Sequence, residues 1–97
     1  MNRFRVQLAA RVGRFLETFD DKSKRICTNK LQKLSQDPYP GKGRGGKERL
    51  VVRGEEVFQL HIGRRYTAFY VIVEKERVVR VFEILPIDQA HKKYGYK

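Results

Sequence analysis

The stretch FQLHIGRRYTAFYVIV, Phe58–Val73, decides the fold of this chain. Apolar residues alternate with other residues on both sides of the basic break GRR, and a period of two is typical of β-strands. A break this short joins antiparallel strands, so the stretch predicts a β-hairpin. If Phe58 and Leu60 face the core, then Gln59 and His61 face the opposite way and need an explanation.

The chain after Glu48 is predicted to consist almost entirely of strands. RLVVR, VFQLHI, YTAFYVIV and VVRVFEIL are separated only by the turn sequences RGEE, GRR and EKER, which predicts a four-strand antiparallel meander. The later strands are apolar on both faces. The second face of the sheet therefore requires a small second core, a partner segment or a ligand that covers it.

The first half of the chain predicts a short strand and two helices. FRVQL at Phe4–Leu8 alternates with period two, and apolar residues then recur at helical spacing. The apolar stripe of the first helix is Leu8, Val12, Phe15, Leu16 and Phe19. A second helix is expected from Asp21 or Ser23 to about Gln36, where Pro38 ends it. Its predicted inward residues are Ile26, Cys27, Leu31 and Leu34.

These elements predict one α+β domain over residues 1–97. An N-terminal strand and a helical hairpin are expected to pack on the four-strand antiparallel sheet, and a short helical turn to follow at 88–94. His91 and Tyr94 lie three residues apart, so on a helical turn they would share a face.

The net charge, the cysteine count and the lack of long apolar segments restrict the classes of function that this chain can have. The 97 residues carry a net charge of +11, which favours a polyanionic partner such as RNA or an acidic protein. The single cysteine, Cys27, excludes an internal disulfide and fits a reducing compartment. No segment approaches the roughly 20 apolar residues of a membrane span, so we expect a cytoplasmic protein that does not use a membrane. We also expect no metal and no cofactor.

The segment Pro38–Lys47 is rich in glycine and basic residues. It lacks the spacing and the following Ser or Thr of a phosphate-binding P-loop, and no strand precedes it. We interpret it as a basic connector, whose Lys42, Arg44 and Lys47 could reach a nucleic-acid backbone.

The order of elements, together with LQKLSQDP, LHIGRRYTAFYVIV and the VVRVFEIL strand with its His- and Tyr-bearing tail, resembles the RelE/ParE superfamily of toxins from toxin–antitoxin pairs. The resemblance spans most of the chain and agrees with the predicted fold. It implies metal-independent cleavage of messenger RNA in the ribosomal A site, in which the 2′-hydroxyl attacks the adjacent phosphate. Such chemistry needs a base, cations for the developing charge and an acid for the leaving oxygen.

The resemblance supplies candidate site residues. The candidate catalytic residues are His61, Arg65, His91 and Tyr94. The candidate RNA- or phosphate-binding residues are Lys42, Arg44, Lys47, Arg49, Gln59, Arg64, Thr67, Lys92 and Lys93. Two family arginines are missing, because Thr67 stands where one commonly follows the tyrosine and the segment 86–88 replaces another. Each candidate also has an ordinary structural alternative: a surface histidine, a polar turn, or a tyrosine packed on the sheet.

Three functions remain open at the level of sequence. The first is a ribosome-dependent RNA endonuclease toxin, and the second is a ParE-like toxin that binds DNA gyrase without cleaving RNA. The third is a non-toxic basic module that binds nucleic acid or a partner. In all three we expect an acidic antitoxin-like protein to cover the sheet face.

Overall fold

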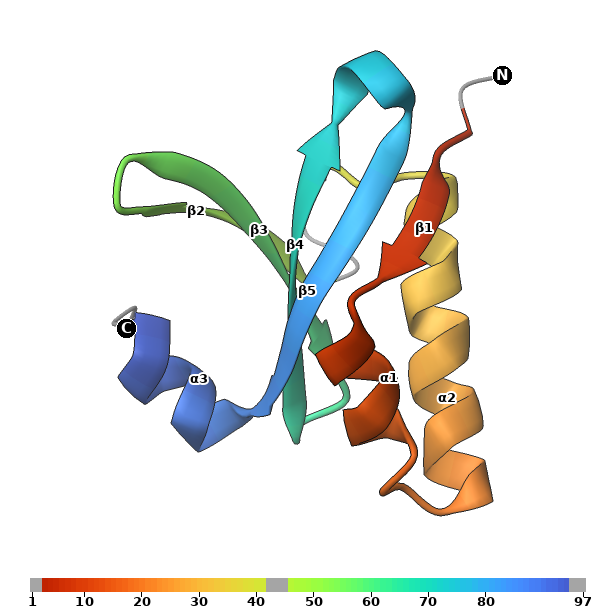
Figure 1. Ribbon diagram of the computed structural model, residues 1–97. Helices are drawn as coiled ribbons and strands as arrows, with labels where there is room; N and C mark the ends of the chain where they lie inside the picture. The colour runs from red at the N-terminus through yellow and green to blue at the C-terminus, as the bar shows by residue number, and fades with distance from the viewer. Residues whose placement is uncertain (1–2, 42–45, 95–97) are drawn as a thin grey trace.

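A computed structural model describes residues 3–41 and 46–94 of the chain (Figure 1). The elements in chain order are β1 (Arg5–Leu8), α1 (Ala10–Leu16), α2 (Asp21–Gln32), η1 (Lys33–Ser35), β2 (Lys47–Val52), β3 (Glu55–Ile62), β4 (Tyr66–Val73), η2 (Glu74–Glu76), β5 (Val78–Pro86) and α3 (Ile87–Tyr94). The predicted hairpin is confirmed as β3 and β4, and the predicted tail turn is the helix α3.

The sheet has five strands in the order β1-β5-β4-β3-β2. Strands β2 to β5 form the predicted antiparallel meander. The prediction of a four-strand sheet was wrong in one respect, because β1 joins it at the edge, parallel to β5, from Arg5 opposite Val78 to Leu8 opposite Val81. The sheet is therefore mixed, and the first strand of the chain lies beside the last one.

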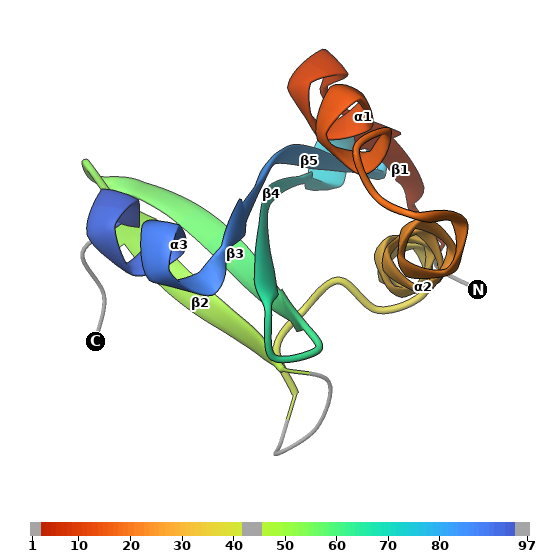
Figure 2. The ribbon, with the colours of Figure 1, turned by 90° about the horizontal axis from the view of Figure 1, so that it is seen from below.

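The helices lie on both sides of this sheet. Helices α1 and α2 cover one face, which we call the inner face, and α3 lies against the opposite, outer face (Figures 1 and 2). The β2–β3 hairpin curls toward α3, so that the outer face is concave (Figure 2). The architecture is the predicted α+β layer arrangement.

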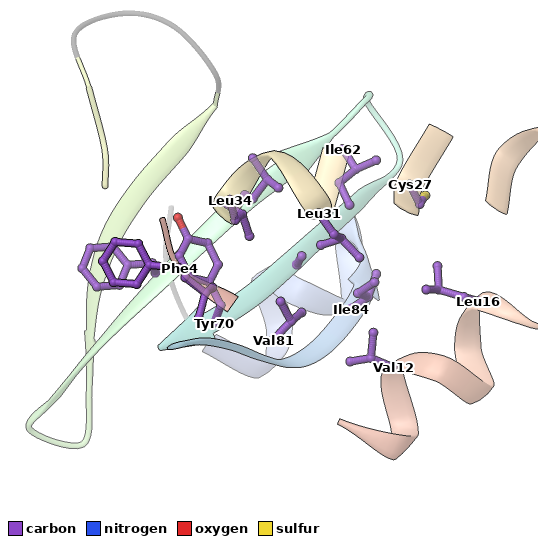
Figure 3. Packing of buried hydrophobic residues seen from close by; sticks show 14 residues of the cluster. Phe4, Val12, Leu16, Cys27, Leu31, Leu34, Ile62, Tyr70, Val81 and Ile84 are labelled. Carbon is purple, nitrogen blue, oxygen red and sulfur yellow. The ribbon is translucent and has the colours of Figure 1, made fainter. Parts of the chain in front are cut away.

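The main core lies between the inner face and the two N-terminal helices (Figure 3). Its largest fully buried residues include Tyr70 and Leu31. The Tyr70 hydroxyl donates a hydrogen bond of 2.6 Å to the Pro38 carbonyl, which gives this buried polar group a partner. The core members are Phe4, Val12, Leu16, Cys27, Leu31, Leu34, Phe58, Leu60, Ile62, Ala68, Tyr70, Val79, Val81 and Ile84.

The helices are shorter than the periodicity predicted. Leu8 belongs to β1, and α1 ends at Leu16 rather than near Phe19. The expected inward position of Ile26 was also wrong, since this side chain is 50% exposed. Cys27 and Leu31 are four residues apart and share the buried stripe of α2, whereas Ile26 is turned about 100° away from Cys27 on the helix.

A β-bulge in β5 changes which residues face outward. Phe69 pairs with Glu83 but its neighbour Tyr70 pairs with Val81, so Phe82 is an extra residue on β5. Strict alternation predicted Phe82 and Glu83 on opposite faces. The bulge instead places both on the outer face, because the inserted residue shifts the alternation by one position.

A second, smaller core fills the middle of the outer face. Val57, Phe69 and Ala90 are buried there, and α3 contributes Ala90 and the half-buried Tyr94. The sequence left open whether a second core, a partner segment or a ligand covers this face, and in the structure a second core covers its centre. The partly buried residues around this core are Leu50, Val52, Val71, Phe82, Leu85 and Tyr94.

The two sides of α2 provide a test of the core assignment. Leu31→Ala is expected to lower the free energy of unfolding by about 2–5 kcal/mol, because Leu31 is only 1% exposed and its removal leaves a cavity. Ile26→Ala on the same helix should cost less than about 1 kcal/mol. Urea unfolding followed by circular dichroism measures both, and equal losses would contradict the assignment.

Candidate functional site

A nearly buried carboxylate lies on the outer face. Glu83 is 7% exposed, and its side chain receives three donors. The Tyr94 hydroxyl donates to Oε1 at 2.7 Å, and Lys93 Nζ lies 2.9 Å from both carboxylate oxygens. Arg11 Nη1 donates to Oε2 at 3.3 Å. We call these four residues the Glu83 cluster.

The fold explains how residues so distant in sequence meet. The bulge turns Glu83 onto the outer face, and α3 follows β5 directly, which places Lys93 and Tyr94 above it. Pairing of β1 with β5 stops at Val81, so β5 has no neighbour on that side at Glu83. Arg11, in the first turn of α1, reaches the carboxylate there.

The contacts within the Glu83 cluster favour an ionised Glu83 carboxylate and a protonated Tyr94 hydroxyl. Burial disfavours the charged form of Glu83, but hydrogen bonds from Tyr94 and Lys93 and the charges of Lys93 and Arg11 outweigh it, and the pKa of the Glu83 carboxyl lies below its ordinary value. Burial, followed by the hydrogen bond to Glu83, raises the pKa of Tyr94. Tyr94 therefore keeps its proton at neutral pH and cannot act as the base of a reaction.

His61 lies at one end of the outer face. Its Nδ1 is 3.3 Å from Thr67 Oγ1 on the neighbouring strand, and its backbone N–H donates to the Gly46 carbonyl at 3.0 Å. The ring is half-buried, and a Cβ on Gly46 would lie 3.4 Å from His61 Cβ. With Nδ1 occupied by Thr67, Nε2 is the ring nitrogen left to meet a ligand.

Gln59 and Thr67 were predicted to be available for RNA binding, but neither side chain reaches solvent. Both are 0% exposed. Gln59 Nε2 donates to Glu48 Oε1 at 2.6 Å, while its own Oε1 is buried without a hydrogen-bond partner in the described part of the chain. The physical reason is the second core, which covers the centre of the outer face that the meander alone would leave open.

The predicted basic residues near the connector are dispersed. Lys47 opens β2 and donates to the Asp37 carbonyl at 2.7 Å. Arg49 pairs with Glu56, and its register opposite the inward Phe58 places it on the inner face, away from His61. Lys42 and Arg44 lie outside the described residues.

The remaining candidates surround the start and the exposed side of α3. Arg64 and Arg65 are exposed in the β3–β4 turn, and the Arg65 carbonyl accepts a hydrogen bond of 2.8 Å from the Ile87 N–H. His91 and Lys92 are exposed on α3, whereas Tyr94 is half-buried against Phe69 with ring centroids 4.2 Å apart. His91 is thus exposed, whereas Tyr94, one turn later on the same helix, is half-buried.

Two hollows lie beside α3 on the outer face. One, of about 450 Å³, is lined by Val52, Arg53, Glu55, Val57, Phe82, Lys93 and Tyr94. The other, of about 370 Å³, is lined by Leu85, Gln89, Lys92 and Lys93. Lys93 lines both. His61, Thr67 and Leu85 are register partners across three strands, and of these three residues Leu85 lines the second hollow.

Sequence reasoning missed Glu83, Arg11, Arg53 and Phe82. A signal existed for Glu83, since it is the one acidic residue in the apolar strand VVRVFEIL. Among residues 3–41 and 46–94, no group of three or more His, Cys, Asp or Glu side chains is placed to hold a metal ion. No helix in the same ranges has the length and apolar character needed to cross a membrane.

The Glu83 cluster makes stability depend on pH. A lowered pKa in the folded state means that ionised Glu83 stabilises the fold above its ordinary pKa of 4.5, and this contribution is lost as pH falls through the folded value. Glu83→Gln should cost about 1–3 kcal/mol at pH 7 and less at pH 3, which lies below the ordinary pKa of the carboxyl.

Urea unfolding at the two pH values measures this difference. Glu17→Gln is the control, because Glu17 pairs with Lys24 while its side chain remains 72% exposed. An equal loss from Glu83→Gln at pH 7 and pH 3 would mean that the charge of Glu83 does not stabilise the fold.

No family model and no curated protein matches the sequence. Solved structures do match. The RelE–RelB complex of Pyrococcus horikoshii OT3 matches at a TM-score of 0.72 and 20% identity over 89% of this chain and 96% of that chain. The toxin–antitoxin complex RelBE2 of Mycobacterium tuberculosis matches at a TM-score of 0.73 and 15% identity, over 89% of this chain and 93% of that chain. A mutant of the Escherichia coli toxin RelE in the free state matches at a TM-score of 0.58 and 11% identity, over 96% of this chain and 95% of that chain. The chain therefore has the fold of the RelE toxins.

Proposed function

We propose that this protein is the toxin of a toxin–antitoxin pair and cleaves messenger RNA on the ribosome without a metal. The observation that carries the proposal is a RelE fold whose concave outer face carries both cations and an imidazole. Lys92 and Lys93 line hollows beside α3, and His61 lies on β3, one strand beyond Thr67 in the row that ends at Leu85. Cations and an imidazole on one face suit an RNA phosphate and a proton transfer.

The proposed roles follow from these positions. His61 exchanges a proton with the RNA through Nε2, since Thr67 holds Nδ1. Lys92 and Lys93 bind phosphate oxygens, and the exposed Arg64 and Arg65 approach the RNA from the β3–β4 turn. Tyr94 contributes its ring and a protonated hydroxyl rather than a base. His91 stands on the exposed side of α3 as a second proton donor.

One observation favours the alternative of a ParE-like toxin that binds gyrase. Tyr94 and Lys93 are both engaged by Glu83, and the two family arginines are absent at Thr67 and at the end of β5. A binding protein does not need those groups free for chemistry. This second function shares the fold and the basic surface, so only an activity measurement separates it from cleavage.

An acidic antitoxin is the proposed protein partner. The chain has a net charge of +11, and two of the matching RelE structures are complexes with an antitoxin. Charge complementarity of this size accelerates association and makes it sensitive to salt. We propose that the antitoxin covers the outer face, where it would exclude RNA from the hollows.

Induced expression followed by primer extension on an abundant message tests the nuclease. We expect ribosome-dependent cuts, and His61→Ala should reduce them by about 10²-fold or more if the imidazole transfers a proton. A His91→Ala, Tyr94→Phe double variant tests the groups on α3 in the same way. Lys75→Ala is the matched control, because Lys75 is exposed in η2, at the end of β4 opposite to the start of α3.

Each outcome points to a different function. Cuts that persist in both variants would exclude these groups from the chemistry. Growth arrest with intact messages and an induced DNA-damage response would move the function to gyrase binding. Normal growth at full expression would leave a basic binding module with the RelE fold.

A further inference from the structure

The larger hollow on the outer face has the composition of a ligand site. It measures about 450 Å³ and is lined by residues of the β2–β3 hairpin, of β5 and of the end of α3. Its apolar lining comes from Val52, Val57 and two aromatic rings, Phe82 and Tyr94. Concave sites that combine apolar and aromatic walls with a few charged groups are suited to small-molecule recognition.

The bulge in β5 creates the aromatic side of this hollow. The extra residue lets both Phe82 and Glu83 lie on the outer face, where strict alternation would place only one of the two. Phe82 and Tyr94 both rest on Phe69, with ring centroids 6.5 and 4.2 Å from it. The two aromatic side chains are therefore supported from behind by a fully buried ring, and they present surface to a planar ligand.

The polar groups of the hollow come from one tight turn. Arg53 and Gly54 both have positive φ, 52° and 81°, which is the geometry of a two-residue type I′ turn between β2 and β3. Asparagine and glycine fit this geometry, whereas arginine pays a steric penalty there. Arg53 and Glu55 flank Gly54, and within residues 3–41 and 46–94 neither side chain forms a hydrogen bond or an ion pair. A guanidinium and a carboxylate without side-chain partners thus line the same hollow.

We propose that this hollow binds a guanine base of single-stranded RNA, a substrate determinant that rests on the function proposed above. The base stacks on the aromatic and apolar walls. The Glu55 carboxylate accepts hydrogen bonds from N1–H and the 2-amino group, the only pair of adjacent donors on a base edge of RNA. Arg53 and Lys93 bind the neighbouring phosphates.

The proposal gives Arg53 and Glu55 separate tasks. Arg53 binds phosphate, which every nucleotide carries, so it contributes affinity without selecting a base. Glu55 accepts hydrogen bonds but repels phosphate, so it favours guanine over uracil, which offers a single N–H donor. The contribution of Arg53 to affinity and that of Glu55 to base selection can therefore be distinguished by comparing the binding of two nucleotides.

The test measures binding of guanosine and uridine 5′-monophosphate to the isolated protein by NMR titration. We expect the wild type to prefer the guanine nucleotide by about tenfold or more, the discrimination that a good bidentate contact supplies. Glu55→Ala should reduce the preference to the small part that the stronger stacking of the larger purine ring supplies. Glu56→Ala is the matched control: it removes the same charge from the adjacent residue, which pairs with Arg49 instead of lining the hollow, and it should keep the preference.

A second variant excludes misfolding as an explanation. Arg53→Asn should weaken both nucleotides equally and leave their ratio unchanged, while thermal stability stays equal or rises because asparagine fits the turn. Equal binding of the two nucleotides by the wild type, or the same loss of preference in both glutamate variants, would overturn the proposal. The titration needs no ribosome, so guanine preference without RNA cleavage would contradict only the proposed function. Cleavage without guanine preference would contradict only this inference.

Discussion

The outer face of this protein depends on the Glu83 cluster, in which the carboxylate is buried while the side chains of Arg11 and Lys93 remain about half exposed. A carboxylate that is 7% exposed beside an apolar core is costly unless donors compensate for the lost water, and Glu83 receives them from Arg11, Lys93 and Tyr94. These contacts join β5 to α1 on one side and to α3 on the other. The position of α3 determines the burial of Gln59 and the shape of both hollows. A single acidic residue thus organises the surface on which function is proposed.

The sequence predicted most of the fold because simple periodicities determine it. Alternation between Phe58 and Val73 identified the hairpin and assigned Leu60 to the inner face, and the apolar stripe of α2 identified Leu31. The bulge could not be predicted, since β5 is apolar at both parities and alternation does not reveal where an extra residue sits. The partner of β1 was equally hidden. A strand of four residues carries little information about which edge it joins.

The site was less predictable than the fold, for a physical reason. The register of β3 and β4 places His61 opposite Thr67, but Tyr66–Val73 is apolar at both parities, so the sequence did not show which of its residues share a face with His61. The Glu83 cluster joins Arg11 to a residue 72 positions later in the chain, and such a contact depends on tertiary packing alone. The burial of Gln59 likewise requires α3 to pack on the outer face. The sequence of a helix of only two turns does not indicate where the helix packs.

The parallel pairing of β1 with β5 has a consequence for how the chain is made. Arg5 and Val78 are neighbours in the sheet, so the first strand has no partner until the last one has left the ribosome. Closing so long a loop is entropically unfavourable, and non-local pairing of this kind slows folding. An incomplete chain would expose the apolar side chains that α1 and α2 bury against β5. Translation that stops before β5 would therefore release an unfolded chain, open to degradation, instead of a partly active protein.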